Sequence, residues 1–297
     1  MKQFVKIFPI ALGAIFFLVL GFWLGDHFAP SKQAETTTES TEKPVVKKEN
    51  KEDTGKDKKE LENKLQQKGN QWAKDYPNSL EYRVYDLGTK QSYTYTNNDE
   101  KNKKYVTASI AKVAVAMMLL HEKEENQKEL TDKQTELLNR MIVSSDNEAT
   151  TSLWESLGGY SALQEFFDER NMKDTKANEE TWGKTTTTTK DQIKLLQELY
   201  TPSEYLTEES QDEIIDLMSR IEPDQSWGVY AGSSNVSFKN GWIIDDVDDQ
   251  WVVNSIGKVS RKDKSYLAVA LSDKNPTIEE GSRVIEDLVR ITSDYLL

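Results

Sequence analysis

The sequence predicts an α/β sandwich in which both ends of the folded domain contribute strands to one antiparallel sheet, with a large helical insertion between them. Two short alternating segments around Gly88 indicate a β-hairpin at the start of the domain. Strand patterns return near the C-terminus, and the stretch between is dominated by helical periodicity. The expected strands are 80–87, 91–96, 236–238, 250–259 and 266–271, and the helical stretch is 109–218.

Two further helices are predicted, one at each end of this domain. Leu61, Leu65 and Trp72 recur at roughly helical spacing, which predicts a first helix from residue 61 to about residue 76, ended by Pro77. An amphipathic pattern predicts a last helix over 278–295. No internal repeat is present, so we expect one domain over 61–297.

The N-terminus carries the pattern of a membrane anchor. Lysines at positions 2 and 6 precede a run, 7–24, that contains no charged residue and is long enough to cross a hydrocarbon core of roughly 30 Å. The flanking charges favour an N-in, C-out orientation, with residues 1–6 as a cytoplasmic tip. A cleaved signal peptide is the alternative. Without cysteine the chain has no lipoprotein anchor and no disulfide. We therefore expect a single-pass protein of the cell membrane whose folded domain is extracellular.

Residues 25–60 are expected to form a flexible spacer, because they are rich in Thr, Glu, Lys, Ser and Pro and almost free of apolar side chains. Residues 1–68 contain 12 lysines and 10 acidic residues, whereas the whole chain has a net charge of −13, so the remainder is strongly acidic. Such a charge argues against nucleic acid and anionic lipid head groups as partners. Its simplest role is solubility, and we expect a monomer.

A candidate catalytic pair lies in the apolar segment 108–120. Ser109 and Lys112 are its only polar residues, and positions i and i+3 of a helix share one face. Burial lowers the pKa of a lysine, which makes it a base able to activate a hydroxyl. The start of a helix also offers backbone N–H groups to an oxyanion. The alternative is that Ser-x-x-Lys occurs here by chance and that Ser109 only caps the helix.

Two more motifs follow in order. Ser145-Asp146-Asn147 stands after an apolar helical segment, and Lys239-Asn240-Gly241 stands on a predicted strand that leads into Trp242. Ser-x-x-Lys, Ser-Asp-Asn and Lys-x-Gly, at gaps of roughly 35 and 95 residues, resemble the motif set of the class A β-lactamase and penicillin-binding protein superfamily. The resemblance covers 61–297. It implies a β-lactamase-like sheet and an acyl-enzyme formed with β-lactams or with D-Ala-D-Ala-like peptidoglycan peptides.

The resemblance also implies a role for each motif residue. Ser109 is similar to the acylated serine, Lys112 to its base, and Ser145 to the hydroxyl that passes the proton to the leaving nitrogen. The implied substrate-binding residues are Asn147, Lys239, Asn240, Gly241 and Trp242. Within this set Asn147 would bind the substrate amide, Lys239 would attract the substrate carboxylate, and the main-chain amides of Ser109 and Trp242 would form the oxyanion hole. The alternatives are that Asn147 caps a helix and that Lys239 is an edge-strand charge.

Two departures from the family pattern bear on turnover. Asn240 stands where the family usually has Thr or Ser, and it lacks the hydroxyl. Class A enzymes carry a Glu-x-x-Leu-Asn loop whose Glu activates the deacylating water, and this pattern is missing between residues 170 and 189. Glu179 or Glu180 are candidate substitutes, although exposed loop charges are the simpler interpretation. We therefore expect acylation with stalled deacylation. The competing hypothesis is a non-hydrolysing penicillin-binding or cell-wall-associated pseudoenzyme.

Other chemistries find little support. The only histidines are His27, beside the membrane segment, and His121, about three turns beyond Ser109, so a Ser-His-Asp triad is not expected. His- or Cys-based metal sites are disfavoured for the same reason, and no Gly-rich phosphate loop is present. We expect no metal and no cofactor. Serine-dependent glutaminases share Ser-x-x-Lys, but an extracellular tether fits them poorly.

Overall fold

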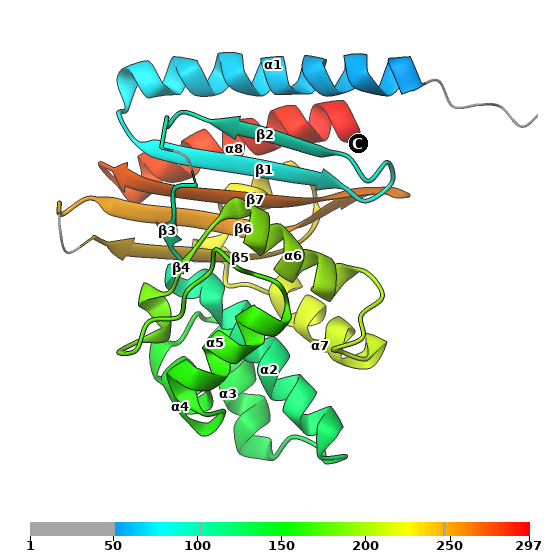
Figure 1. Ribbon diagram of the computed structural model, residues 1–297, viewed down its shortest axis with the longest axis vertical. Coiled ribbons are helices and arrows are strands. Elements are labelled where there is room, and N and C mark those ends of the chain that lie inside the picture. Colours follow the sequence, from blue (N-terminus) through cyan, green and yellow to red (C-terminus); the bar gives the residue numbers. More distant parts are fainter. Residues whose placement is uncertain (1–50, 101, 246–247) are drawn as a thin grey trace, which may run out of the picture. The chain divides into compact units, whose positions relative to one another are not determined.

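The computed structural model describes residues 51–100, 102–245 and 248–297 (Figure 1). The predicted cytoplasmic tip, the predicted anchor over 7–24 and most of the predicted spacer lie outside these residues. Among the helices that are described, none combines the length and the apolar run needed to span a bilayer.

The centre of the domain is a five-stranded antiparallel sheet with strand order β2-β1-β7-β6-β5. Its early hairpin pairs with the last strand, as Tyr82 lies opposite Ala270. This confirms the predicted fold class, since strands from both ends of the domain share one sheet. The strands are β1 (Ser79–Asp86), β2 (Ser92–Thr96), β5 (Asn235–Ile244), β6 (Trp251–Arg261) and β7 (Lys264–Asn275).

Strand β5 is longer than predicted. The apolar pattern indicated only residues 236–238, whereas the strand continues to Ile244. The reason is that Lys239 and Asn240 are fully buried in the middle of the strand, where polar side chains interrupt the pattern on which the prediction depended. The added residues carry the third motif.

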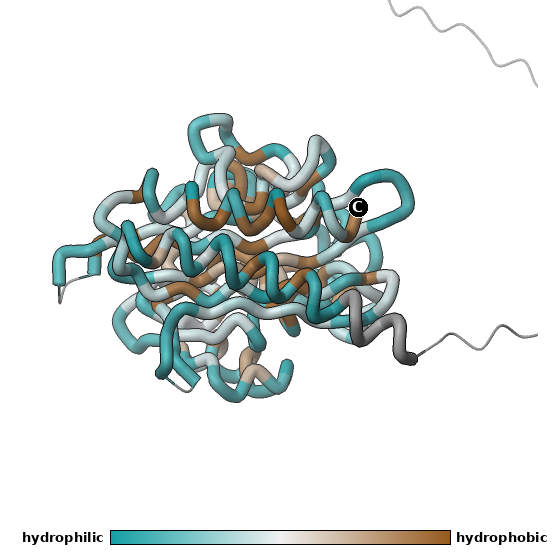
Figure 2. Tube along the Cα trace, turned by 90° about the horizontal axis from the view of Figure 1, so that it is seen from above, coloured by the Kyte–Doolittle hydropathy of each residue, from teal (hydrophilic) through white to brown (hydrophobic). Residues whose placement is uncertain are grey.

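Two helices, α1 (Lys51–Asp75) and α8 (Ile278–Leu296), cover one face of the sheet and lie side by side (Figures 1 and 2). Leu61 and Leu65 of α1 are fully buried, and the Trp72 indole donates to Asp287 of α8 at 2.9 Å. Helix α1 begins ten residues before its predicted start at residue 61, inside the predicted spacer. Exposed Lys–Glu pairs at i, i+4 favour a helix without needing apolar residues, which is why hydropathy alone missed this part.

The opposite side of the sheet carries the helical insertion (Figure 1). Helix α2 (Ala111–Glu125) runs through it, and every residue from Ala111 to Leu120 is buried, as its apolar sequence predicted. Two short strands, β3 (Tyr105–Val106) and β4 (Thr186–Thr187), were not predicted because two residues carry no periodicity. The other helices are α3 (Asp132–Val143), α4 (Asn147–Ser156), α5 (Gly159–Glu169), α6 (Thr189–Tyr200) and α7 (Glu208–Ser219).

Candidate active site

Ser109 lies in a short 3-10 turn, η1 (Ala108–Ile110), directly before α2. The preceding Ala108 has φ 47°, a left-handed conformation that is uncommon for a residue with a side chain. The turn is held from β6 by Asn254, whose Nδ2 donates to Val106 O at 2.8 Å and to Thr107 O at 3.1 Å. A backbone position of this kind persists only when its surroundings fix it. The partly exposed Ser109 is therefore presented at a fixed point at the head of a buried helix.

Strand β5 passes directly against this turn at Gly241. A Cβ atom on Gly241 would lie 2.7 Å from Thr107 O and 2.8 Å from Ser109 N. No other residue fits without moving backbone, so the glycine of the third motif is explained by close approach. Strand β5 and turn η1 thus bring the main chain next to Trp242 close to the main chain of Ser109. An oxyanion hole made by their two amides is consistent with this contact and remains a prediction.

Lys112 is fully buried and directs its amino group at the second motif. Its Nζ donates to Ser145 O at 2.5 Å, to Ser145 Oγ at 3.1 Å and to Asn147 Oδ1 at 2.8 Å. Burial lowers the pKa of Lys112 to about 7, against the opposing attraction of Asp146. Near pH 7 the ammonium, whose three N–H groups make these three contacts, is therefore in equilibrium with the neutral amine, whose lone pair can accept a proton.

Lys239 reaches the same hydroxyl from β5. It is fully buried, and its Nζ donates to Ser145 Oγ at 2.9 Å. Burial, and secondarily the charge of Lys112, hold the pKa of Lys239 well below its ordinary value. An edge-strand surface charge is excluded by this position. The structure thus brings Lys112, Ser145 and Lys239 together around one oxygen atom.

The second motif is positioned by the start of α4. Asp146 is the N-cap: its carboxylate accepts from Ala149 N at 2.9 Å and from Arg140 Nε at 2.9 Å. These hydrogen bonds and the Arg140 charge lower the pKa of Asp146. Asn147 is therefore not the cap. It stands at the first helical position, exposed, where its side chain can reach a substrate.

The side chain of Asn240, a predicted substrate-binding residue, is occupied within the fold. Its side chain is fully buried, and Nδ2 donates to Gln225 O at 2.8 Å and to Trp227 O at 3.1 Å. Its Oδ1 accepts from Ser255 Oγ at 2.6 Å. Both amide protons are used within the fold, so Asn240 holds a loop in place and offers substrate no donor.

Two aromatic contacts of the motif residues were not predicted from the sequence. Trp182, 6% exposed, lies in the 3-10 turn η2 (Trp182–Lys184), with its ring centroid 4.8 Å from Lys112 Nζ and its Nε1 bonded to Thr151 Oγ1 at 3.1 Å. Trp227 packs edge-on against Trp242, with ring centroids 5.9 Å apart. A lone tryptophan in a loop carries no motif, and the sequence motifs indicate only Trp242. The proposed substitutes Glu179 and Glu180 are exposed.

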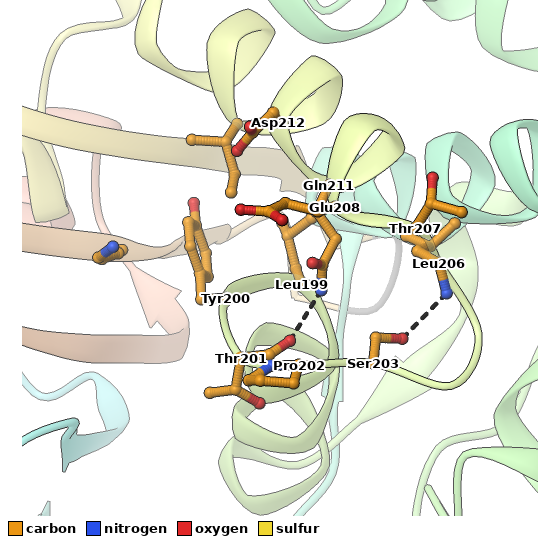
Figure 3. Close-up of a pocket in the computed structure, with 12 residues that line it drawn as sticks. Leu199, Tyr200, Thr201, Pro202, Ser203, Leu206, Thr207, Glu208, Gln211 and Asp212 are labelled. Carbon is orange, nitrogen blue, oxygen red and sulfur yellow. Dashed lines mark hydrogen bonds between the residues drawn. The ribbon is translucent and has the colours of Figure 1, made fainter. Parts of the chain in front are cut away.

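A separate cavity of about 500 Å³ lies between the end of α6 and the start of α7 (Figure 3). The ring of Tyr200 borders it, and the Tyr200 hydroxyl bonds Ser237 at 2.8 Å, two residues before Lys239. None of the motif residues lines this cavity. Across the part of the chain that the structure describes, no group of three His, Cys, Asp or Glu side chains is arranged to hold a metal ion.

The site combines a serine at the head of a buried helix, two buried lysines bonded to a second hydroxyl, and an edge strand packed against the serine. This combination defines a serine hydrolase of the β-lactamase type. A family comparison agrees: the chain belongs to the beta-lactamase enzyme family, whose model matches residues 131–296. That match begins after Ser109 and Lys112, so the family model does not cover the first motif. The position of these two residues is known from the structure alone.

Solved structures with the same fold are numerous. The structure of PBP-A has a TM-score of 0.65 at 23% identity and covers 78% of this chain and 95% of its own. The TLA-3 extended-spectrum β-lactamase has a TM-score of 0.69 at 16% identity, with 80% and 98% covered. A class A β-lactamase from Bacteroides cellulosilyticus has a TM-score of 0.68 at 16% identity, with the same coverage. No curated protein sequence matches this chain.

Proposed function

We propose that this protein is a membrane-tethered, extracellular serine enzyme that forms an acyl-enzyme at Ser109 with β-lactams or D-Ala-D-Ala-like peptides and releases it slowly. The observation that carries the proposal is the convergence of Lys112 and Lys239 on Ser145 Oγ, at 3.1 and 2.9 Å. A structural role alone gives no reason to bury two amines around one hydroxyl beside a strained serine turn.

The proposed acylation uses the motif residues in turn. Neutral Lys112 takes the proton of Ser109 as Oγ attacks the substrate carbonyl. The amides of Ser109 and Trp242 stabilise the resulting oxyanion. The proton then passes through Ser145 Oγ to the leaving nitrogen as the C–N bond breaks. Lys239 holds Ser145 in place for this transfer, and the acyl group remains on Ser109.

Deacylation lacks an evident base. The amino group of Lys112 also lies 4.8 Å from the centroid of the Trp182 ring, which cannot take a proton from water. The nearby loop carboxylates, Glu179 and Glu180, are turned to solvent. Water activation is therefore expected to be slow, and the protein behaves as a penicillin-binding protein in preference to an efficient β-lactamase.

The tether and the location rest on the sequence. The uncharged run over 7–24, the lysines before it and the polar spacer after it support a single-pass anchor with the enzyme domain outside the cell. Peptidoglycan-type peptides are found on that side of the membrane, which fits the proposed substrate.

Labelling of the full-length chain with a fluorescent penicillin, followed over time beside Ser109→Ala, tests this function. A Ser109-dependent adduct that persists for many minutes supports the proposal. A short-lived adduct with steady product release indicates an efficient β-lactamase and contradicts slow release. No adduct contradicts the penicillin-type mechanism and favours a pseudoenzyme.

A further inference from the structure

The segment 222–229 connects the second motif to the third. At one end, Ser144 Oγ donates to the Glu222 carboxylate at 2.7 Å, and Glu222 N donates to the carbonyl of the last residue of α3 at 3.2 Å. Gln225 adds another link, because its side-chain Nε2 donates to Ser144 O at 3.3 Å. Three hydrogen bonds therefore attach this segment to the chain directly before Ser145.

The other end of the segment is held from β5. Adjacent residues of a strand point to opposite faces, so Asn240 points away from the face on which Lys239 reaches the second motif. On its own face, Asn240 Nδ2 donates to the main-chain oxygens of Gln225 and Trp227 at 2.8 and 3.1 Å. Ser255 fixes the Asn240 amide, since its Oγ donates to Asn240 Oδ1 at 2.6 Å. Because β5 is an edge strand, the segment can pass around it from one face of the sheet to the other.

These contacts close a ring through the candidate site. The ring runs through Ser144, Gln225, Asn240, Lys239 and Ser145. Gln225 is 6% exposed, and its Oε1 finds no hydrogen-bond partner among the described residues. A buried acceptor without a partner destabilises a fold, so stability alone gives no reason for an amide at this position. What the ring fixes is the place of Ser145 Oγ relative to Lys239.

We propose that Gln225, acting through Asn240, is a positioning residue that holds Ser145 Oγ where it protonates the leaving nitrogen. In the proposed acylation, the proton that Lys112 takes from Ser109 passes through Ser145 Oγ to this nitrogen as the C–N bond breaks. Such a transfer needs hydrogen-bond reach, and a misplacement of about 1 Å can cost roughly 10²-fold in rate. This inference rests on the proposed function, because it concerns that proton transfer.

Two substrates distinguish the positioning of Ser145 from a general loosening of the site. Benzylpenicillin releases a nitrogen that must receive a proton, whereas the thioester of N-benzoyl-D-alanine with thioglycolate releases a thiolate, which leaves without one. Gln225→Met keeps the length of the side chain and removes its N–H donors. In the full-length chain, we expect this variant to slow acylation by benzylpenicillin roughly 10–100-fold and acylation by the thioester less than about threefold. Single-turnover measurements give both rates.

An equal loss with both substrates, or no loss with benzylpenicillin, overturns the inference. Asn240→Leu removes the second link of the ring at similar volume and should show the same selective loss, so it tests the ring even if Gln225→Met does not fold. Failure of benzylpenicillin to acylate the unmodified chain would instead contradict the proposed function.

The matched control is Gln211→Met in α7. Gln211 is also buried, at 8% exposed, and its Nε2 donates to Glu198 O at 2.7 Å and to Thr201 O at 2.8 Å. It lines the separate cavity of Figure 3, away from the motif residues. This variant loses more hydrogen bonds than Gln225→Met does, yet both acylation rates should stay unchanged. A selective loss with benzylpenicillin in the control would show that any buried glutamine has this effect and would contradict the role assigned to Gln225.

Discussion

The polar and the aromatic parts of the candidate site differ in how they are built. In the polar part, Lys112, Ser145 and Lys239 come from a buried helix, a helix start and a sheet strand, and each is fixed by hydrogen bonds. In the aromatic part, Trp182 and Trp227 come from a short 3-10 turn and a loop, and they are held by ring packing and by hydrogen bonds to Thr151 and Asn240. We infer that the polar part makes the acyl-enzyme, whereas the Trp182 ring over Lys112 prolongs the life of the adduct because it offers water no base.

The largest expected effect tests the polar part. Lys112→Met removes the base but keeps a side chain of similar length, and we expect the acylation rate to fall roughly 10²–10⁴-fold. Stopped-flow acylation by a chromogenic penicillin measures it. Lys133→Met, an exposed lysine of α3, is the matched control and should leave the rate unchanged. A Lys112 variant that acylates normally would remove the polar part from the mechanism.

A smaller effect tests the aromatic part. Trp182→Glu places a carboxylate where the indole contacts Lys112, and we expect deacylation to quicken at least about tenfold as water gains a base. The same carboxylate raises the pKa of Lys112, so acylation near pH 7 should slow. Adduct formation and decay, followed by intact mass, separate these opposite changes.

Two controls accompany this variant. Trp182→Phe keeps a ring over Lys112 and should keep the adduct long-lived, whereas Glu179→Gln alters an exposed carboxylate and should change neither rate. If Trp182→Phe releases the adduct as fast as Trp182→Glu, a looser loop and not a new base explains the result.

Packing remote from the candidate site should affect stability alone. Leu65 of α1 is fully buried, and Leu65→Ala should cost about 2–5 kcal/mol of unfolding free energy in urea. Lys64→Ala, which breaks an exposed pair with Glu60, should cost less than about 1 kcal/mol. The acylation rate of either variant should match that of the unmodified chain. A Leu65 variant that is as stable as the Lys64 variant would show that α1 is not an integral part of the domain.

The difference between the polar and the aromatic parts of the site also explains which features could be predicted from the sequence. Helix α2 and strands β1, β2, β6 and β7 follow from hydrophobic periodicity, whereas Ser109, Lys112, Ser145 and Lys239 were indicated by short sequence motifs. Trp182 and Trp227 could not be predicted, because their place depends on loop paths and on contacts between distant residues. The burial of the Asn240 side chain could not be predicted either, because a motif gives a residue's position in the chain but not the partners of its side chain.

The dependence of the acylation rate on pH tests the central claim most directly, namely that Lys112 acts as a neutral base. Its lowered pKa, about 7, means that Lys112 is protonated and inactive as a base at lower pH and becomes available as the pH rises. Single-turnover acylation by a penicillin should therefore increase close to tenfold per pH unit below about pH 6 and level off above about pH 8. A rate that is constant, or that falls, as the pH rises through about 7 would contradict the account.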